Sequence, residues 1–152
     1  MPKRDTLETN LTSAFLGARH QIPAMIDRGG GSLIFTSTFV GYTVGFPGMA
    51  AYAAAKAGLI GLTQVIAAEY GAKGIRANAI LPGGTDTPMG RAVASTPEIR
   101  RFVEGLHALK RLAAPEEIAR SVLPAKSFAM RAASSRSAFF LSLSVHATSM
   151  TS

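Results

Sequence analysis

The chain has 152 residues, of which 47% are apolar and 16% are charged, with no cysteine and a formal net charge of +7. That apolar content excludes a chain that is disordered over most of its length, and the length favours one domain. The lack of cysteine excludes disulfides, thiolate metal sites and a cysteine nucleophile. Apolar runs fall short of the roughly 18–20 residues that a membrane span needs, so we expect no membrane segment and a cytoplasmic location.

The positive charge is unevenly distributed. Nearly half of the excess lies in residues 121–152, which contain three Lys or Arg and no Asp or Glu. A nucleic-acid-binding face would need clustered basic residues interleaved with aromatic ones, and the sequence shows neither pattern. We therefore predict no nucleic-acid partner.

The first third of the chain predicts a helix and a strand. Apolar residues recur every three or four positions over residues 6–26, which is typical of an amphipathic helix. Pro23 is expected to kink or interrupt its last turns, and the three glycines at 29–31 end it. Residues 32–37 then predict a short buried strand, followed by a loop over 41–48.

The longest predicted helix covers residues 50–72, which are rich in alanine and leucine, and Gly74 follows its end. Its apolar side chains surround most of the helix. We therefore expect one face to contact a sheet and another to contact a second subunit in a homo-oligomer.

A second strand is predicted at residues 75–81, and a loop with one short helix is predicted at 85–112. Pro115 and the acidic residues after it begin a further helix, which Pro124 is expected to end after about two turns. No final strand is expected in residues 124–152, which are rich in serine, alanine and arginine.

The order of helices and strands indicates the α/β class with a doubly wound, Rossmann-like parallel sheet. Two such strands alone would leave unpaired edges and uncovered faces. We therefore predict a partial sheet, the second half of a three-layer α/β/α domain. Residues 1–123 form this unit, and residues 124–152 form an atypical tail.

Tyr52 and Lys56 are four residues apart at the start of the long helix, which places them on one face. An ammonium held beside a phenol favours the phenolate, so that a tyrosine becomes a usable proton donor and acceptor. The alternative is a tyrosine that packs at the helix start while the lysine is solvated.

Polar and glycine residues follow both predicted strands. Ser37 and Thr38 end the first strand, and the second runs into a glycine-rich segment over residues 78–87. Ligands bind at the carboxyl ends of the strands in open α/β folds, where glycine also lets a ligand approach the backbone. A hydroxyl, a phenol and an ammonium can therefore converge on one carbonyl group.

Together these segments resemble the short-chain dehydrogenase/reductase family from about residue 5 to residue 121. Each motif is short, but their common order is specific. The motifs are Asn10-Leu11, Gly29-Gly30-Gly31-Ser32, Thr36-Ser37-Thr38, Tyr52 to Lys56, and Asn78 to Thr87.

The resemblance implies an oxidoreductase that uses NAD or NADP to interconvert a small alcohol and a ketone. Tyr52 would exchange a proton with the substrate oxygen, while Lys56 would assist its ionisation and hold the nicotinamide ribose. Asn10 would hold a water of a proton relay. The residues implied to contact the nicotinamide are Pro82, Gly83, Thr85 and Thr87, in addition to Tyr52 and Lys56.

The carbonyl-binding hydroxyl departs from the family pattern. The family's serine lies thirteen residues before the tyrosine, where this chain has Phe39. Alignment on Gly41 would select Thr38, whereas residue type selects Ser37, which we prefer. Residues 87–112 correspond to the family's variable substrate lid and do not identify the substrate. The three histidines do not share a metal-ligand spacing, so no metal is assigned.

The family's glycine-rich turn for the dinucleotide phosphates has no counterpart in this sequence. We therefore expect a chain truncated at its N-terminus and inactive by itself. The alternative is a non-catalytic protein that pairs with intact subunits of the family.

Overall fold

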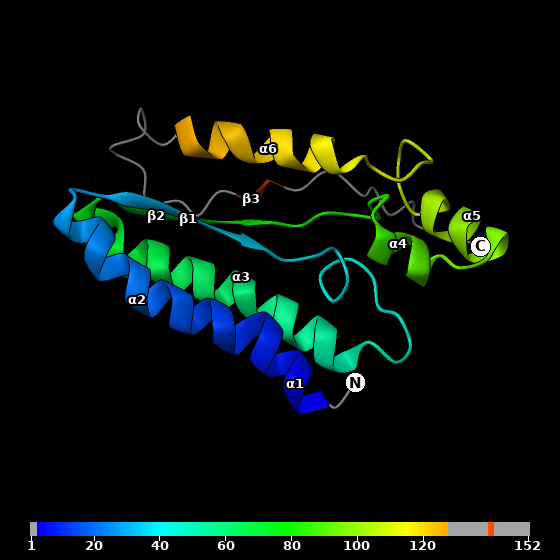
Figure 1. The fold of residues 1–152 in the computed structure, drawn as a ribbon, viewed down its shortest axis with the longest axis horizontal. Helices are drawn as coiled ribbons and strands as arrows, with labels where there is room; N and C mark the ends of the chain where they lie inside the picture. The colour runs from blue at the N-terminus through cyan, green and yellow to red at the C-terminus, as the bar shows by residue number, and fades with distance from the viewer. Residues whose placement is uncertain (1–2, 128–139, 142–152) are drawn as a thin grey trace, which may run out of the picture.

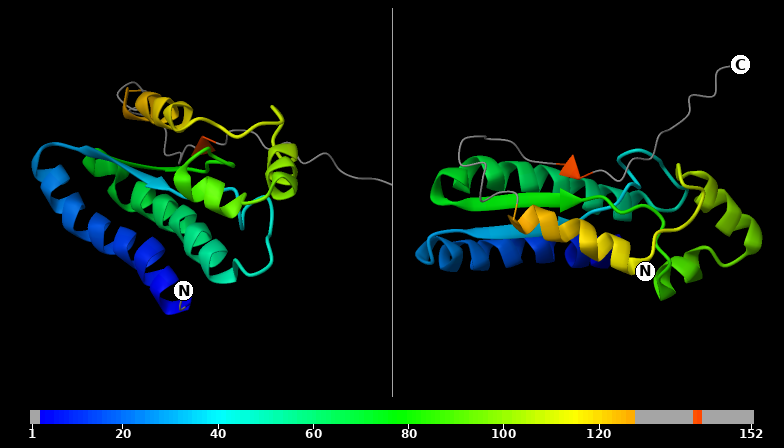
Figure 2. Two further views of the ribbon diagram at one scale, coloured as in Figure 1. Left: turned by 45° about the vertical axis from the view of Figure 1, so that its right-hand side comes forward. Right: turned by 90° about the horizontal axis from the view of Figure 1, so that it is seen from above.

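A computed structural model describes residues 3–127 and 140–141. A parallel sheet lies in the middle, with α2 and α3 on one face and α6 on the other (Figures 1 and 2). The order β1-β2-β3 makes β1 an edge strand among the described residues. The predicted α/β fold with a partial parallel sheet is confirmed.

The N-terminal helix is continuous but changes its winding. It comprises α1 (Lys3–Leu7), a π-helical segment (Glu8–Thr12) and α2 (Ser13–Asp27). Of the kink or interruption expected at Pro23, the interruption is wrong, because the helix runs on to Asp27. Proline removes the bond to the carbonyl four residues earlier, which belongs to exposed Arg19 and can be hydrated.

The sheet pairs β1 (Gly31–Thr36) with β2 (Ile75–Ile80) in parallel over their whole lengths, with Gly31 opposite Ile75. A short strand β3 (Phe140–Leu141) pairs in parallel with Ala79 and Ile80. The expectation of no final strand after residue 123 is therefore wrong at these two residues.

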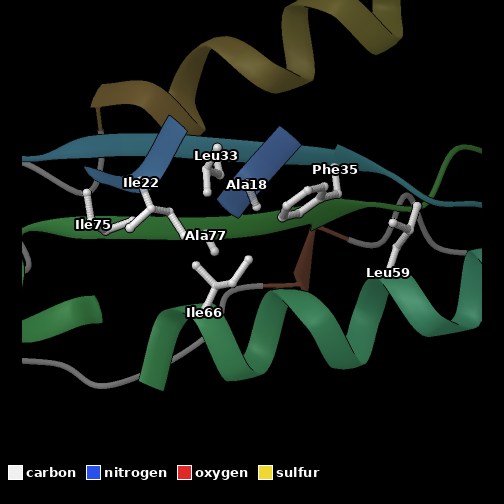
Figure 3. Close-up of a cluster of buried hydrophobic side chains, with 8 residues drawn as sticks. All are labelled: Ala18, Ile22, Leu33, Phe35, Leu59, Ile66, Ile75 and Ala77. Atoms are coloured by element: carbon white, nitrogen blue, oxygen red, sulfur yellow. The ribbon is translucent and has the colours of Figure 1, made fainter. Parts of the chain in front are cut away.

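The core lies between the sheet and the helices α2 and α3 (Figure 3). Side chains from α2, β1, α3 and β2 meet there because each element turns one apolar face inward. The buried residues are Ala18, Ile22, Leu33, Phe35, Leu59, Ile66, Ile75 and Ala77. This cluster fixes the position of α3 relative to the strand ends.

The long helix α3 (Ala50–Tyr70) is followed by a 3-10 turn (Gly71–Lys73) and by Gly74 in the left-handed conformation. Its buried side chains are Ala55, Leu59, Thr63 and Ile66, which recur at helical spacing on one face. By length and composition alone, Ala50–Lys73 is long and apolar enough to cross a membrane. Core helices of soluble proteins pass the same test, and α3 packs on β2.

Residues 88–127 contain more helix than expected. In place of one short helix there are α4 (Pro88–Val93) and α5 (Pro97–Gly105), whose N-caps are Thr87 and Thr96. Helix α6 (Pro115–Ser127) continues past Pro124, so the expected end there is wrong. The bond lost at this proline would involve the carbonyl of exposed Arg120, which water can satisfy.

Candidate active site

The candidate site lies where β1 and β2 end and α3 begins. Figure 1 shows α4 and α5 at this same end of the sheet. The core holds α3 against the sheet, so the first turns of α3 stand beside the loop that leaves β1. The predicted meeting of strand ends and helix start is therefore present in the fold.

Two hydrogen bonds connect the end of β1 to the helix turn that carries Lys56. The Lys56 Nζ donates to the Thr36 carbonyl at 2.8 Å, and the Ser37 hydroxyl donates to the Lys56 carbonyl at 2.7 Å. Both the backbone and the side chain of Lys56 are thereby held. This long side chain has little rotational freedom left to lose when a ligand binds.

Tyr52 lies one turn before Lys56, as predicted, and the Lys56 Nζ is 5.8 Å from the centre of the Tyr52 ring. Both residues are partly exposed. Burial lowers the pKa of the Lys56 ammonium, because a low-dielectric environment disfavours its charged form. The pair thus combines an accessible phenol with a fixed cation nearby.

The two candidate hydroxyls occupy different environments. Ser37 is buried, and its proton is directed to the Lys56 carbonyl. Thr38 is also buried, and its Oγ1 accepts from the Val40 N–H at 3.4 Å. The proton of Ser37 is therefore engaged, whereas the bond from Val40 uses Thr38 only as an acceptor.

The segment after β2 is hydrogen-bonded to the loop after β1 and to the residues that precede α6. The Phe39 N–H donates to the Pro82 carbonyl at 3.3 Å, and the Ala113 N–H donates to the Gly84 carbonyl at 2.9 Å. Thr85 forms a bridge with Ala113, and its hydroxyl donates to the Gly83 carbonyl at 3.1 Å.

Thr87 has a structural use that the sequence did not predict. Its Oγ1 accepts from the Gly90 N–H at 3.0 Å and caps α4. The predicted nicotinamide contacts Pro82, Gly83, Thr85 and Thr87 thus lie on one fixed segment, with the Thr87 oxygen already engaged.

Asn10 lies in the π-helical segment, where its Nδ2 donates to the Thr6 carbonyl at 2.9 Å. The next residue, Leu11, packs so closely on Gly58 of α3 that a Cβ on Gly58 would come within 2.7 Å of the Leu11 side chain. Gly58 is two residues after Lys56, so this contact holds the Asn10 segment against α3 near Lys56. π-Helical turns are frequent at functional sites.

His107 lies in the predicted substrate lid of residues 87–112, and the sequence predicted no contact for it. Its Nε2 accepts from the Gly84 N–H at 2.9 Å, and its ring lies 5.6 Å from the Phe39 ring. No local pattern could have revealed these contacts, because they join segments far apart in the chain. Among the residues that the structure describes, no group of three or more His, Cys, Asp or Glu could hold a metal ion.

Comparison with known proteins shows which family the chain resembles. Residues 3–132 match a family model described as enoyl-(acyl carrier protein) reductase. The chain is 38% identical over 122 residues to 2,5-dichloro-2,5-cyclohexadiene-1,4-diol dehydrogenase of Sphingobium indicum, covering 79% of this chain and 48% of that protein. It is 36% identical to cyclohexanol dehydrogenase of an Acinetobacter species, covering 78% of this chain and 45% of that protein.

Two solved structures are similar to this chain in fold and sequence. A putative gluconate dehydrogenase from Agrobacterium tumefaciens has a TM-score of 0.80 and 29% identity, covering 93% of this chain and 56% of that one. A putative NAD(P)-dependent gluconate 5-dehydrogenase from Beutenbergia cavernae, with NADP bound at low occupancy, has a TM-score of 0.76 and 28% identity, covering 80% and 49%. The chain spans about half the length of the curated relatives it matches. It belongs to the short-chain dehydrogenase/reductase family.

Proposed function

We propose that this chain carries the proton-transfer end of an NAD- or NADP-dependent oxidoreductase that interconverts a secondary alcohol and a ketone. One observation carries the proposal. Tyr52 and Lys56 lie one turn apart at the carboxyl end of a parallel sheet, and the Lys56 ammonium is anchored to the β1 carbonyl of Thr36. Ligands of open α/β folds bind at this end.

The residues present fit the nicotinamide end of the cofactor. A phenol and a fixed ammonium, both partly exposed, lie at the carboxyl end of the sheet, from which the glycine segment after β2 also leaves. In this proposal Lys56 holds the ribose, and Pro82, Gly83, Thr85 and Thr87 line the ring. The cofactor, when bound, supplies or accepts the hydride at the substrate carbon.

Tyr52 moves the proton that balances the hydride. In reduction its phenol gives the proton to the carbonyl oxygen, so that the ketone gains one hydride and one proton and becomes an alcohol. In oxidation the phenolate takes the hydroxyl proton. Lys56 supports the phenolate through its positive charge, because an opposite charge nearby favours the ionised form.

A strand-end hydroxyl would orient the substrate carbonyl. Residue type favours Ser37, but its proton is directed to the Lys56 carbonyl. We therefore propose that Thr38 donates to the substrate and that Ser37 holds the turn of Lys56. Asn10 is proposed to serve a water-mediated proton path, which its place in the π-helical segment beside α3 supports.

The substrate class comes from the relatives. Two of them are named for the oxidation of ring alcohols, a cyclohexadiene diol and cyclohexanol. We infer that a cyclic secondary alcohol suits this chain. The 152 residues include no counterpart of the glycine-rich phosphate-binding turn, so we expect the chain alone to show no turnover.

The test is a chimera in which the amino-terminal half of the Sphingobium indicum dehydrogenase precedes residue 3. We expect it to oxidise cyclohexanol with NAD or NADP, and Tyr52→Phe to lower kcat by about 10²- to 10⁴-fold. Tyr70→Phe, at the other end of α3, is the matched control and should leave kcat unchanged. Equal activity of both variants would contradict the role of Tyr52.

A second candidate function is subunit pairing, which one surface favours. Helices α2 and α3 form a mainly apolar groove of about 490 Å³, lined by Phe15, Leu62 and Val65 among others. Phe15 is 52% exposed and Val65 is 53% exposed. Paired apolar faces of this kind suit contact with the same face of a second family subunit.

Size-exclusion chromatography with light scattering tests this pairing. We expect the chain to be dimeric and Val65→Glu to make it monomeric, because the variant would bury an unpaired charge. Gln64→Glu, on an exposed neighbouring position, is the control. A monomeric wild-type chain that also forms no complex with the intact Sphingobium enzyme would contradict the pairing.

A further inference from the structure

The described residues contain one histidine whose ring joins three separate segments of the site. His107 follows α5, its Nε2 accepts from the Gly84 N–H, and its ring faces Phe39 in the loop after β1. The segment 82–87 comes after β2. The imidazole therefore lies where both strand-end loops meet the helical segment of residues 88–105.

The fit of the ring against the glycines is close. A Cβ on Gly83 would come within 2.5 Å of the His107 ring, and a Cβ on Gly84 within 2.9 Å of its Nε2. Such approaches are shorter than real Cβ contacts, so a side chain at 83 would displace the ring, and one at 84 would conflict with the ring, Leu112 and Val103. The close contact with His107 therefore requires glycine at both positions, whether or not a ligand also approaches them.

The hydrogen bond fixes the chemical state of the ring. A neutral imidazole has one nitrogen that donates and one that accepts, whereas the protonated ring only donates. Because the Gly84 N–H donates to Nε2, the proton of the neutral ring must lie on Nδ1. Protonation at Nε2 would break this bond.

Aromatic contacts also hold the His107 ring in place. Phe39 is buried and lies 6.1 Å from Phe46 in an edge-on arrangement, and Phe46 lies 6.3 Å from Phe102 of α5. The Phe39 N–H also donates to the Pro82 carbonyl. A movement of the His107 ring would therefore displace both the loop after β1 and the segment after β2.

We propose that His107 is a positioning residue of the candidate active site, whose neutral ring fixes the backbone of Gly83 and Gly84 for the cofactor. This inference rests on the proposed function for the identity of the ligand. It goes beyond that function because it assigns the positioning of cofactor-binding backbone to a side chain of the predicted substrate lid, residues 87–112.

The electrostatic surroundings agree with a neutral ring. Burial and, to a smaller extent, the positive charge of Lys110 hold the pKa of His107 below its ordinary value of 6.5. Charged side chains near the ring include three that are engaged in ion pairs, and α5 carries a fourth pair, Glu98 with Arg101. The three pairs near the ring are Glu104 with Arg100, Asp86 with Arg91, and Glu117 with Arg111.

The sign of the pH dependence follows. The unfolded chain takes up the histidine proton near pH 6.5, before the folded chain does, so folded stability decreases as the pH falls below 6.5. Below the lowered pKa of the folded state, the ring is protonated and the bond from Gly84 is lost. The segment is therefore expected to be fixed at neutral pH and released in acid.

Amide hydrogen exchange of the full 152-residue chain, measured by NMR, tests the link without any turnover. At neutral pH we expect His107→Ala to raise the exchange rate of the Gly84 amide by about 10-fold. His107→Gln should restore protection, because its amide oxygen can accept, and should keep it in acid. His20→Gln, on the exposed part of α2, is the matched control.

The wild-type chain gives a second measurement that needs no variant. Its imidazole ¹⁵N shifts should show an unprotonated Nε2 at pH 7. A protonated Nε2, or equal Gly84 exchange in wild type and His107→Ala, would overturn the inference. The Ala113 amide, which donates to the Gly84 carbonyl, shows whether a variant has lost the whole segment.

The cofactor role is tested separately in the chimera. We expect His107→Ala to raise the KM for NAD or NADP by about 10-fold and His107→Gln to recover most of it. An unchanged KM with a deprotected Gly84 amide would overturn the positioning role. If every chimera lacks turnover while Gly84 protection still depends on His107, the proposed function fails and the His107–Gly84 link stands.

Discussion

The core and the candidate site are held together by different interactions. In the core, side chains such as Leu59 and Ile75 are 3% and 1% exposed and contact several elements at once. At the site end, single hydrogen bonds and left-handed glycines fix the loops, while Met89 is 79% exposed and Phe102 58%. Burial therefore sets where the site lies, and a few polar contacts set its geometry.

The largest expected effect is in the core. Leu59→Ala removes buried methyl groups from the face of α3 that packs on the sheet, and we expect it to lower the free energy of unfolding by about 2–5 kcal/mol. Leu109→Ala is the control, because Leu109 is 72% exposed. Urea denaturation followed by circular dichroism measures both. A loss below about 1 kcal/mol for Leu59→Ala would show that burial does not dominate there.

The two strand-end hydroxyls are expected to separate in function. Thr38→Val removes the proposed donor to the substrate and should lower kcat/KM of the chimera by about 10²-fold. Ser37→Ala should instead weaken the hold on the Lys56 turn, with an effect of about 10-fold through the loss of one hydrogen bond. Steady-state kinetics measures both variants. A larger loss of kcat/KM for Ser37→Ala than for Thr38→Val would show that Ser37 binds the substrate.

Gly41 fixes the loop after β1 against the start of α3, because it has a φ of +82° and a Cβ on it would come within 2.8 Å of Ala53. We expect Gly41→Ala to cost about 1–2 kcal/mol of stability from the left-handed backbone, in addition to the steric conflict. Gly45→Ala, in the same loop, meets no atom within 4 Å and is the control. Equal melting temperatures of the two variants would argue against this loop contact.

The smallest effect concerns the start of α6. Two hydrogen bonds from Arg111 and one from the Ala114 N–H lower the pKa of the Glu117 carboxyl to about 2. A lowered carboxyl pKa stabilises the fold above about pH 4.5, and this contribution is lost as the pH falls toward 2. Glu117→Gln should therefore flatten the stability profile over this window in acid denaturation. A variant with an unchanged slope would contradict the pairing.

The fold could be predicted where local apolar patterns decide it. The strand at residues 75–81 and the helix at 50–72 are found within two residues of their predicted ends, because burial on one face enforces the period. The prolines misled prediction. Pro23 and Pro124 both follow, by four residues, an exposed arginine whose carbonyl can be hydrated, so the helices continue.

The site could be predicted only in part. Tyr52 and Lys56 share a helix face, which their spacing determines. The direction of the Ser37 proton and the contact of His107 with Gly84 depend on segments 19 and 23 residues away. A local pattern carries no information about such pairings.

Transfer of label from C4-deuterated NADH or NADPH tests the central claim most directly. The chimera is given cyclohexanone and each stereoisomer of the labelled cofactor, and the product is analysed by mass spectrometry. We predict one deuterium on the carbinol carbon from one stereoisomer, with the labelled alcohol forming about 10²- to 10⁴-fold more slowly in the Tyr52→Phe variant. Cyclohexanol that forms without deuterium from either cofactor, or labelled alcohol that forms at the wild-type rate in the variant, would contradict the claim that Tyr52 supplies the proton that accompanies hydride transfer.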